Sequence, residues 1–360
     1  MGVGLYFKKL DELRFIAFFL VFWQHAFSPS FSNLTGNKIL KTIIDTLTIT
    51  GGIGVHIFFV ISGFLITFLM IKEELTKGSI SLLFFYTRRI LRIWPLYYLI
   101  LVLGIFVLPN LFNTFKFNGS LIKNLLFLNN FDMENQAPNV GIAWSVAIEE
   151  QFYLFWPIIF IIIRNKTLLL IFSIFLFLFS IWYVIEFPSE NYFHTFGNIR
   201  FLMTGCIGAI FYSQLKKVRP NSFIIKSTTF HFIIFTSLIF IILSPFFKTI
   251  YFLSLIGLPL TYILIILILV DNNNDSKTSF CSKMGKYTYG MYLYHPMIII
   301  FIKIIFDLLK FDYANNSLIN LFLAIISLTT TIIISTLSYK YFERYVLRFK
   351  NKFSFVTTRI

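Results

Sequence analysis

Two ionisable side chains, Arg14 and His25, interrupt the apolar segment LDELRFIAFFLVFWQHAF at residues 10–27. In an α-helix their spacing returns the chain to nearly the same face and separates them by roughly 16 Å along the axis. Histidine is the usual general base near neutral pH, and arginine binds phosphate well. The pair predicts a base deep in the segment and an anion site near its start. The alternatives are that Arg14 only reaches towards lipid headgroups and that His25 only bonds a neighbouring helix.

Acidic residues occur in a second apolar segment, WSVAIEEQFYLFWP at 144–157. Ser145, Glu149 and Tyr153 recur every four residues and form one polar stripe on a helix, whereas Glu150 shares its row with apolar side chains. We therefore expect Glu149 to face the interior of a helical bundle. A carboxylate beside a histidine can orient it as a base, and a purely structural ion pair is the alternative.

The segment GVHIFFVISGFLIT at 54–67 places His56, Ser62 and Gly63 within another apolar run. His56 is a further ionisable group and a candidate cavity residue. Ser62 and Gly63 either take part in the chemistry or allow a second helix to approach closely.

Three arginines, Arg88, Arg89 and Arg92, cluster in YTRRILRIWPLYYL at 86–99. Arg88 and Arg92 share a helical face. Such a cluster suits a phosphate site, because guanidinium groups bind phosphate bidentately. It equally suits the positive charge and aromatic belt that flank a membrane segment on its inner side.

His295 precedes Pro296 in TYGMYLYHPMII at 288–299. The proline frees a backbone carbonyl one turn earlier and bends the helix. We expect a structural role for His295 first, at this break, and a place in the cavity wall second.

The elements that carry these groups must lie in a lipid bilayer. The chain has 360 residues, of which 57% are hydrophobic and 13% charged, and its mean hydropathy is +0.79. A soluble domain needs more polar surface. A cleaved signal peptide is disfavoured, because His25 interrupts the first apolar run and no small-residue cleavage site follows it. Cys206 and Cys281 fit no metal or disulfide pattern.

The sequence predicts an all-α integral membrane protein, a single bundle of about ten transmembrane helices. The expected spans are centred on residues 10–28, 52–71, 90–109, 142–163, 167–185, 197–215, 229–246, 250–270, 288–306 and 318–340. The seventh and eighth are separated only by SPFFKT and should form a tight hairpin. The polar connection 108–141 is either a substrate-facing loop or a solvated connector.

The net charge of +15 has the distribution of a topology signal. Most of the 31 Lys and Arg residues fall in alternate connections, which the positive-inside rule places in the cytoplasm together with both termini. The charge therefore predicts contact with a membrane and no binding of nucleic acid.

Five of these segments together resemble acyltransferase family 3, a family of integral-membrane acyltransferases. The similarity rests on Arg-x10-His, FFVISGFLIT, RRILRIWPLYY, WSVAIEEQFYLFWP and YGMYLYHP, in the family's order. It spans LDELR near the start to SYKYFERYVLRF near the end, so we expect the family domain at 1–345 and a short basic cytoplasmic tail at 346–360. We expect no appended extracytoplasmic domain of the kind some relatives carry.

The resemblance implies a cytoplasmic acyl-CoA donor, usually acetyl-CoA, and an acceptor hydroxyl on an extracytoplasmic or lipid-linked polysaccharide. It implies a location in a bacterial plasma (inner) membrane. The family's histidine maps onto His25, its arginine onto Arg14, and its acidic position onto Glu149 and Glu150. The chain departs from the family at His56, where an acid is common.

Combined with the donor that the resemblance implies, these residues predict that Arg14, Arg88, Arg89 and Arg92 hold the phosphates of coenzyme A, while the thioester reaches His25. His25 would act as the base, with Glu149 orienting it, although an acyl-enzyme route stays open. No metal is implied. Buried His and Glu also suit a proton-coupled transporter or exporter of a glycan or lipid-linked intermediate, and a non-catalytic receptor is a third class.

Overall fold

The structure is a computed structural model, and it describes residues 7–27, 51–112, 117–137, 139–188, 192–218, 251–271, 279–350 and 353. All regular secondary structure in these ranges is helical, as predicted. The long helices are α1 (Lys8–Ala26), α3 (Gly52–Lys77), α4 (Leu82–Val102), α7 (Trp144–Ile162), α8 (Lys166–Glu186), α9 (Thr195–Val218), α11 (Tyr251–Asp271), α13 (Thr288–Leu308) and α14 (Ser317–Ser338).

Shorter pieces extend or connect these helices. A π-helical turn, Leu103–Val107, joins α4 to α5 (Leu108–Phe112), and a second, Tyr339–Glu343, joins α14 to α15 (Arg344–Lys350). The short helices α6 (Leu121–Leu125) and α12 (Phe280–Gly285) precede α7 and α13. Three 3₁₀ turns, Asn129–Phe131, Met133–Asn135 and Gly141–Ala143, lie between α6 and α7.

Local signals in the sequence explain several helix ends. Ser81, Asn165 and Asn316 begin α4, α8 and α14, and each side chain accepts a hydrogen bond from a backbone N–H of the first turn. Gly78 ends α3 with φ +76°, a conformation that glycine adopts without steric cost. These ends fix where the membrane segments start and stop.

Six helical segments in the described ranges are long and apolar enough to cross a membrane: Gly52–Lys77, Leu82–Leu111, Gly141–Ile162, Lys166–Glu186, Thr288–Leu308 and Ser317–Phe349. Helices also occupy the expected positions of the first, sixth and eighth spans, but α1 begins with several charged residues and is less apolar. The expected seventh span, 229–246, the hairpin turn after it and most of the tail at 346–360 lie outside the described residues.

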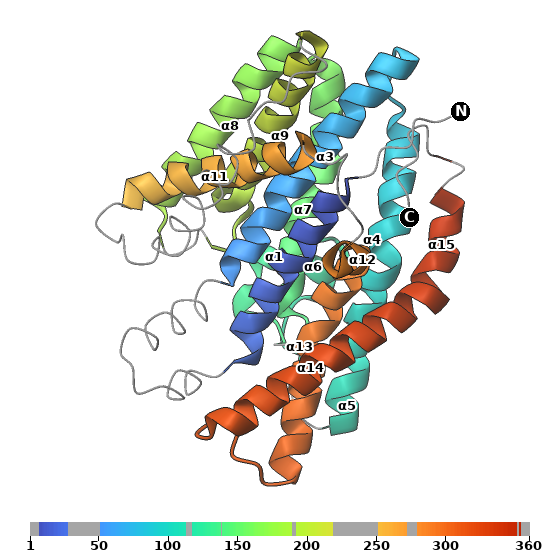
Figure 1. Cartoon of the computed structure of the whole chain (residues 1–360), viewed down its shortest axis with the longest axis vertical. Helices are drawn as coiled ribbons and strands as arrows, with labels where there is room; N and C mark the ends of the chain where they lie inside the picture. Colours follow the sequence, from blue (N-terminus) through green and yellow to red (C-terminus); the bar gives the residue numbers. More distant parts are fainter. Residues whose placement is uncertain are drawn as a thin grey trace.

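The helix α3 packs directly against α9, backbone to backbone (Figure 1). A Cβ atom added to Gly63 would lie 2.0 Å from the carbonyl oxygen of Leu202, and one added to Gly205 would lie 2.2 Å from that of Val60. Gly63 is therefore a packing residue, which was one of the two readings of its motif. The contact brings the neighbouring Ser62 to a fixed position.

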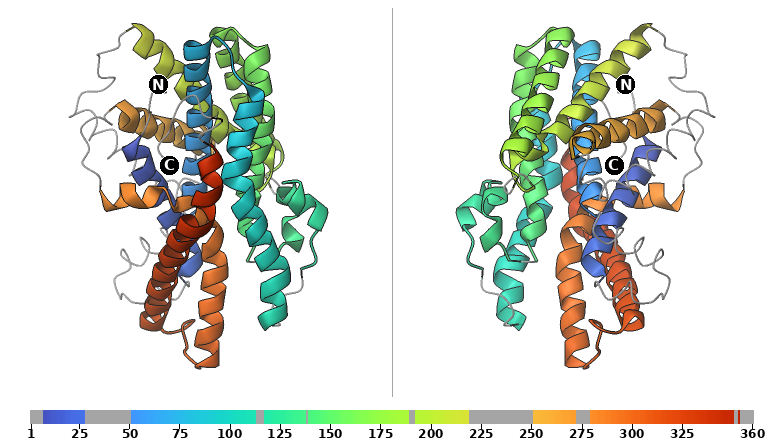
Figure 2. Two further views of the ribbon diagram at one scale, coloured as in Figure 1. Left: turned by 90° about the vertical axis from the view of Figure 1, so that its right-hand side faces the viewer. Right: turned by 90° about the vertical axis from the view of Figure 1, so that its left-hand side faces the viewer.

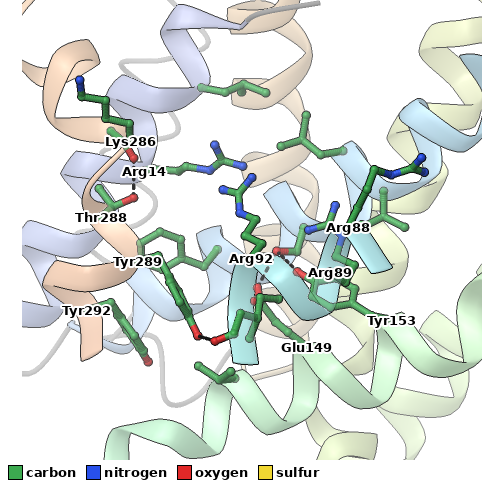
Figure 3. A pocket seen from close by; sticks show the side chains of 18 of the residues that line it. Arg14, Arg88, Arg89, Arg92, Glu149, Tyr153, Lys286, Thr288, Tyr289 and Tyr292 are labelled. Carbon is green, nitrogen blue, oxygen red and sulfur yellow. Dashed lines mark hydrogen bonds between the residues drawn. The ribbon is translucent and has the colours of Figure 1, made fainter. Parts of the chain in front are cut away.

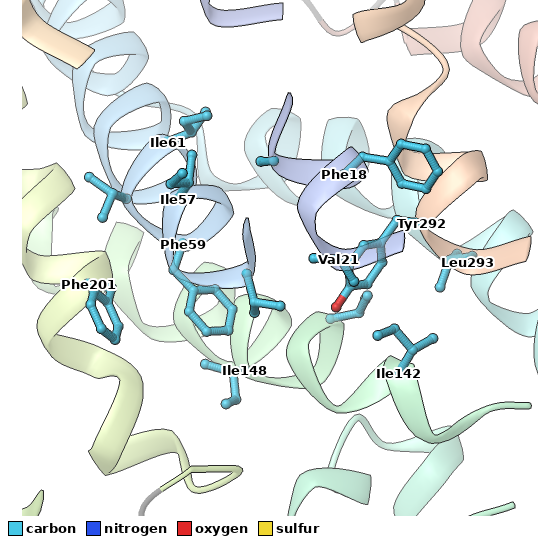
Figure 4. Packing of buried hydrophobic residues seen from close by; sticks show 14 of the residues in the cluster. Phe18, Val21, Ile57, Phe59, Ile61, Ile142, Ile148, Phe201, Tyr292 and Leu293 are labelled. Atoms are coloured by element: carbon cyan, nitrogen blue, oxygen red, sulfur yellow. The ribbon is translucent and has the colours of Figure 1, made fainter. Parts of the chain in front are cut away.

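The helices form two groups, and α1 packs against both of them. One group contains α3, α8 and α9, and α13 pairs with α14 in the other (Figures 1 and 2). Figure 4 shows buried apolar side chains from α1, α3, α7, α9 and α13 meeting between the helices, among them Phe18, Phe59, Ile148 and Phe201. This core fixes the relative positions of the helices that carry the predicted functional groups.

Hydrogen bonds attach the described part of the connection before α7 to the membrane helices. It projects to one side of the bundle beside α4 (Figure 2). The Gln151 side chain of α7 donates hydrogen bonds to the Phe127 carbonyl (2.7 Å) and to Asn130 Oδ1 (2.9 Å). Within the connection, Asp132 accepts from the backbone N–H of Ser120 (2.9 Å), and this bond lowers the pKa of its carboxyl. The segment is thus held against the membrane helices.

Candidate active site

A cavity of about 260 Å³ lies between α1, α3, α4, α7, α13 and the segment from α14 to α15 (Figure 3). Its wall carries the basic side chains of Arg14, Arg88, Arg89, Arg92 and Lys286 and the acidic side chains of Asp11, Glu73, Glu149 and Glu343. The structure thus brings all four predicted arginines together with Ser62, Ser145, Glu149 and Tyr153. The excess of basic groups favours an anionic ligand.

Two of the four arginines are already paired. Arg88 Nη2 lies 2.9 Å from Glu73 Oε2, and Arg88 Nη1 donates to the Phe353 carbonyl at 2.7 Å. Glu73 is only 4% exposed, and its other oxygen accepts from the backbone N–H of Ser81 at 3.2 Å. Arg14 pairs with Asp11 at 2.8 Å, one turn earlier on α1. A ligand would have to compete for Arg88 with a buried carboxylate.

The other two arginines remain available to a ligand. Within the part of the chain that the structure describes, Arg89 and Arg92 make no ion pair or hydrogen bond. The Arg89 guanidinium lies 4.8 Å from the centre of the Tyr153 ring. Arg92 is exposed, and Figure 3 shows its guanidinium beside that of Arg14. Two neighbouring cations repel one another until an anion binds between them.

The polar stripe on α7 faces the cavity through Glu149. Ser62 of α3 donates to Glu149 Oε1 at 2.5 Å, and the Tyr153 hydroxyl donates to Ser62 Oγ at 3.0 Å. Glu150 does not line the cavity, and its Oε2 accepts from Trp94 Nε1 at 2.8 Å. The expected difference in orientation between the two acids is therefore seen.

One end of the cavity is formed by Ser145 and Tyr292. The two hydroxyl groups are hydrogen-bonded at 2.6 Å, and the Tyr292 ring stands edge-on to Phe58, with ring centres 5.7 Å apart. The centre of the Tyr292 ring is also 5.9 Å from that of His295, which does not line the cavity. The Tyr292 side chain therefore borders the cavity and lies beside this histidine.

His25 and His295 form a pair at this position. His25 Nδ1 and His295 Nε2 are 2.9 Å apart, and the two rings stack with their centres 5.2 Å apart. His295 is fully buried, whereas His25 is exposed. The expectation that Glu149 would be the partner of His25 is thus not met, because α1 packs against α13 and brings His295 to it. The cavity does not reach His25 in this structure.

His56, a predicted cavity residue, does not line this cavity. Its ring stacks on Phe201 of α9, with the centres 3.9 Å apart, and it is not among the lining residues. His56 lies on the face of α3 that packs against α9, seven residues before Gly63. Within the described residues its Nδ1 atom has no hydrogen-bond partner.

Sequence reasoning missed several cavity residues. Tyr292 precedes His295 by three residues and so shares its helical face, which could have been noticed. Glu343 ends a π-helical turn, which has more residues per turn than an α-helix. The α-helical repeat therefore does not predict that its side chain faces the cavity. Glu73 and Asp11 read as charges at helix ends, and only the tertiary structure shows that they pair with Arg88 and Arg14.

The described residues include no group of three or more His, Cys, Asp or Glu side chains placed to hold a metal ion. The cavity instead combines cations, hydroxyl groups and carboxylates, with an imidazole pair beyond Tyr292. Such a set can bind an anionic ligand and transfer a proton.

Comparison with known proteins gives a family match over most of the chain. A family model described as an acyltransferase domain matches residues 7–339. The peptidoglycan O-acetyltransferase OatA of Listeria monocytogenes is 27% identical over 361 residues, covering 89% of this chain and 56% of that protein. The O-acetyltransferase OatA of Staphylococcus aureus is 28% identical over 369 residues, covering 94% of this chain and 58% of that protein.

A third relative, an uncharacterized protein of Haemophilus influenzae, is 35% identical over 189 residues, covering 45% of this chain and 76% of its own length. The chain therefore spans a little more than half the length of the two OatA relatives. No solved structure matches it.

Proposed function

The chain belongs to the family whose acyltransferase-domain model matches residues 7–339, and we propose that it is a multi-pass membrane O-acyltransferase. It would transfer an acyl group, most simply acetyl, from cytoplasmic acyl-CoA to a hydroxyl of an extracytoplasmic or lipid-linked glycan, in the plasma membrane of a bacterium. The single observation that carries the proposal is the cavity itself. Its wall holds both the arginine cluster and the hydrogen-bonded hydroxyl pair of Ser145 and Tyr292, and the Tyr292 ring lies beside His295.

The arginine end of the cavity suits the phosphates of coenzyme A. Arg92 and Arg89 make no ion pair or hydrogen bond among the described residues, and Arg14 stands next to Arg92 (Figure 3). A pyrophosphate between these groups would relieve their mutual repulsion and gain charge-assisted hydrogen bonds. Arg88 has a different part in this proposal, because it pairs with Glu73 and holds the backbone at Phe353.

The pantetheine arm would follow the cavity wall past Ser62 and Glu149 towards Ser145 and Tyr292. The distance suits the donor, since Arg14 and His25 lie on one helix roughly 16 Å apart along its axis. The thioester must then pass the hydrogen-bonded pair of Ser145 and Tyr292, so this pair has to open during turnover. In this scheme Glu149 anchors Ser62 on the path of the arm and does not orient His25.

The transfer itself needs one base. His25 would accept the proton of the acceptor hydroxyl as the oxygen attacks the thioester carbonyl, so that an ester C–O bond forms and the C–S bond breaks. The proton then passes from His25 to the departing sulfur, giving the free thiol of coenzyme A and the acylated glycan. His25 is exposed and does not line the cavity, which supports an acceptor that reaches it without entering the cavity.

Acetyl transfer can be measured in membrane vesicles that contain the protein, supplied with radiolabelled acetyl-CoA. We expect label in glycan, and we expect His25→Ala to reduce it by at least about 100-fold, the usual contribution of a general base. His194→Ala is the matched control, because His194 lies outside the cavity, between α8 and α9. Undiminished acetylation by His25→Ala would refute the assignment of the base.

The same vesicles separate the enzyme from a transporter. Intramembrane histidines and carboxylates also serve proton relays. A transporter would move a glycan or lipid-linked intermediate across the vesicle membrane without leaving label on it. Translocation without acetylation would therefore overturn the proposed function.

A further inference from the structure

The histidine pair assigns a role to His295, and the assignment rests on the proposed function. We propose that His295 is a positioning residue that holds His25 in the tautomer with hydrogen on Nδ1. In that tautomer the Nε2 atom of His25 carries a free lone pair and is the atom that takes the proton of the acceptor.

The contacts form a chain of two hydrogen bonds across α1 and α13. His295 Nδ1 is 3.2 Å from the Met291 carbonyl oxygen, one helical turn earlier, and His295 Nε2 is 2.9 Å from His25 Nδ1. Both ring nitrogens of His295 are therefore in contact with fixed partners. The rings of Phe18 and Phe22 stand edge-on to His295, with centres 5.9 and 6.3 Å away, and hold it in place.

The Met291 carbonyl decides which way the protons point. A carbonyl oxygen only accepts hydrogen bonds, so Nδ1 of His295 must carry a hydrogen. His295 is 0% exposed and packs among aromatic rings. A buried cation without an anionic partner is costly, so the His295 ring is neutral. A neutral imidazole has one hydrogen only, so Nε2 of His295 is the acceptor. His25 must then donate from Nδ1.

This order of protons suits the proposed reaction. When Nε2 of His25 takes a proton, the imidazolium that forms still donates from Nδ1 to His295, and a hydrogen bond from a charged donor is stronger than one from a neutral donor. The bond between the two rings thus helps the transition state more than the ground state, which is the condition for a catalytic contribution. Without it, His25 could rotate or change tautomer.

Two substitutions separate positioning from packing. In His295→Gln the terminal amide reaches the place of Nε2, and its oxygen can accept from His25. In His295→Asn the shorter amide reaches only the place of Nδ1, so the bond to Met291 is kept and the bond to His25 is lost. We expect kcat to fall about 100-fold or more in His295→Asn, with KM for acetyl-CoA changed less than about twofold, and to recover to within about tenfold of the native rate in His295→Gln.

His194→Asn is the matched control and should leave kcat unchanged. Equal losses of kcat in the Gln and Asn variants would overturn the positioning role, and so would a loss that appears in KM alone. The thermal midpoint of each variant shows whether it folds, and the Gln variant keeps the test valid if the Asn variant does not.

The tautomer can also be read without any activity. Nitrogen-15 NMR of histidine-labelled protein in lipid nanodiscs distinguishes protonated from unprotonated ring nitrogens, and a His25→Phe sample identifies the signals of His25. We expect Nδ1 of His25 to carry the hydrogen in the native protein and a mixture of tautomers in His295→Asn. A hydrogen on Nε2 in the native protein would refute the inference even if acetyl transfer is found. Failure of acetyl transfer with the expected tautomer would instead refute the proposed function.

Discussion

Gly63 lies where the backbones of α3 and α9 touch, and the substitution Gly63→Ala tests how this contact supports the cavity. The added Cβ would stand 2.0 Å from the Leu202 carbonyl oxygen, whereas ordinary contact begins near 3.4 Å. The shortfall is about 1.4 Å, and the group that must yield is helical backbone rather than a flexible side chain. The two helices must therefore separate locally.

Two consequences of different size follow from that separation. Forcing an extra carbon into a filled contact costs about 1–3 kcal/mol of stability. The shift also displaces Ser62, the preceding residue, whose hydroxyl is 2.5 Å from Glu149. A displacement of about 1 Å in a positioning group can reduce the rate about 100-fold. We therefore expect activity to fall far more than stability.

The assay combines the thermal midpoint of the protein in detergent with acetyl transfer in vesicles. Gly141→Ala is the matched control, because a Cβ added there meets no atom within 4 Å. It should leave both readings unchanged. If Gly63→Ala behaved like Gly141→Ala in both assays, the close approach of α3 and α9 described here would be wrong.

Three further predictions concern the cavity and the connection before α7. Arg92→Ala should raise KM for acetyl-CoA about 10- to 100-fold through loss of a charge-assisted contact. Arg88→Ala should mainly lower the thermal midpoint, because it leaves Glu73 buried without its partner. Steady-state kinetics and melting curves that show the reverse would contradict this division. Tyr292→Phe removes the bond to Ser145 and should increase release of free thiol from acetyl-CoA when no acceptor is present; an unchanged rate would argue against a closing role for the pair. Because the pKa of Asp132 is lowered in the folded protein, its carboxylate stabilises the connection at pH values above its usual pKa near 3.8, and this contribution is lost as the pH falls through the lower folded-state pKa. Asp132→Asn should therefore speed hydrogen exchange of the Ser120 amide at neutral pH. Protection equal to that of the native protein would contradict this.

Much of the fold follows from one-dimensional patterns that a single sequence contains. Apolar length places the helices, and the side chains of Ser81, Asn165 and Asn316 mark their starts. The four-residue repeat also predicts that Glu149 and Glu150 point to different neighbours, because that difference depends on one helix alone: Glu149 lines the cavity and Glu150 bonds to Trp94.

The errors concern which helices are neighbours. Glu149 was expected to orient His25, and His56 was expected in the cavity, but the positions of residues along their helices do not fix the order of the helices around a bundle. Close glycine contacts bring α3 against α9 and turn His56 onto Phe201. His295, for which a structural role was expected first, lies beside His25 because α13 packs on α1.

The aromatic side chain of Tyr292 borders the cavity and lies beside His295 of the imidazole pair. On the proposed route only the thioester end of the donor and its acyl group pass this side chain, while the nucleotide part of the donor never leaves its own side. Such an enzyme has no need of a continuous water-filled pore. The cell would thus be able to decorate its exterior while keeping the membrane potential intact.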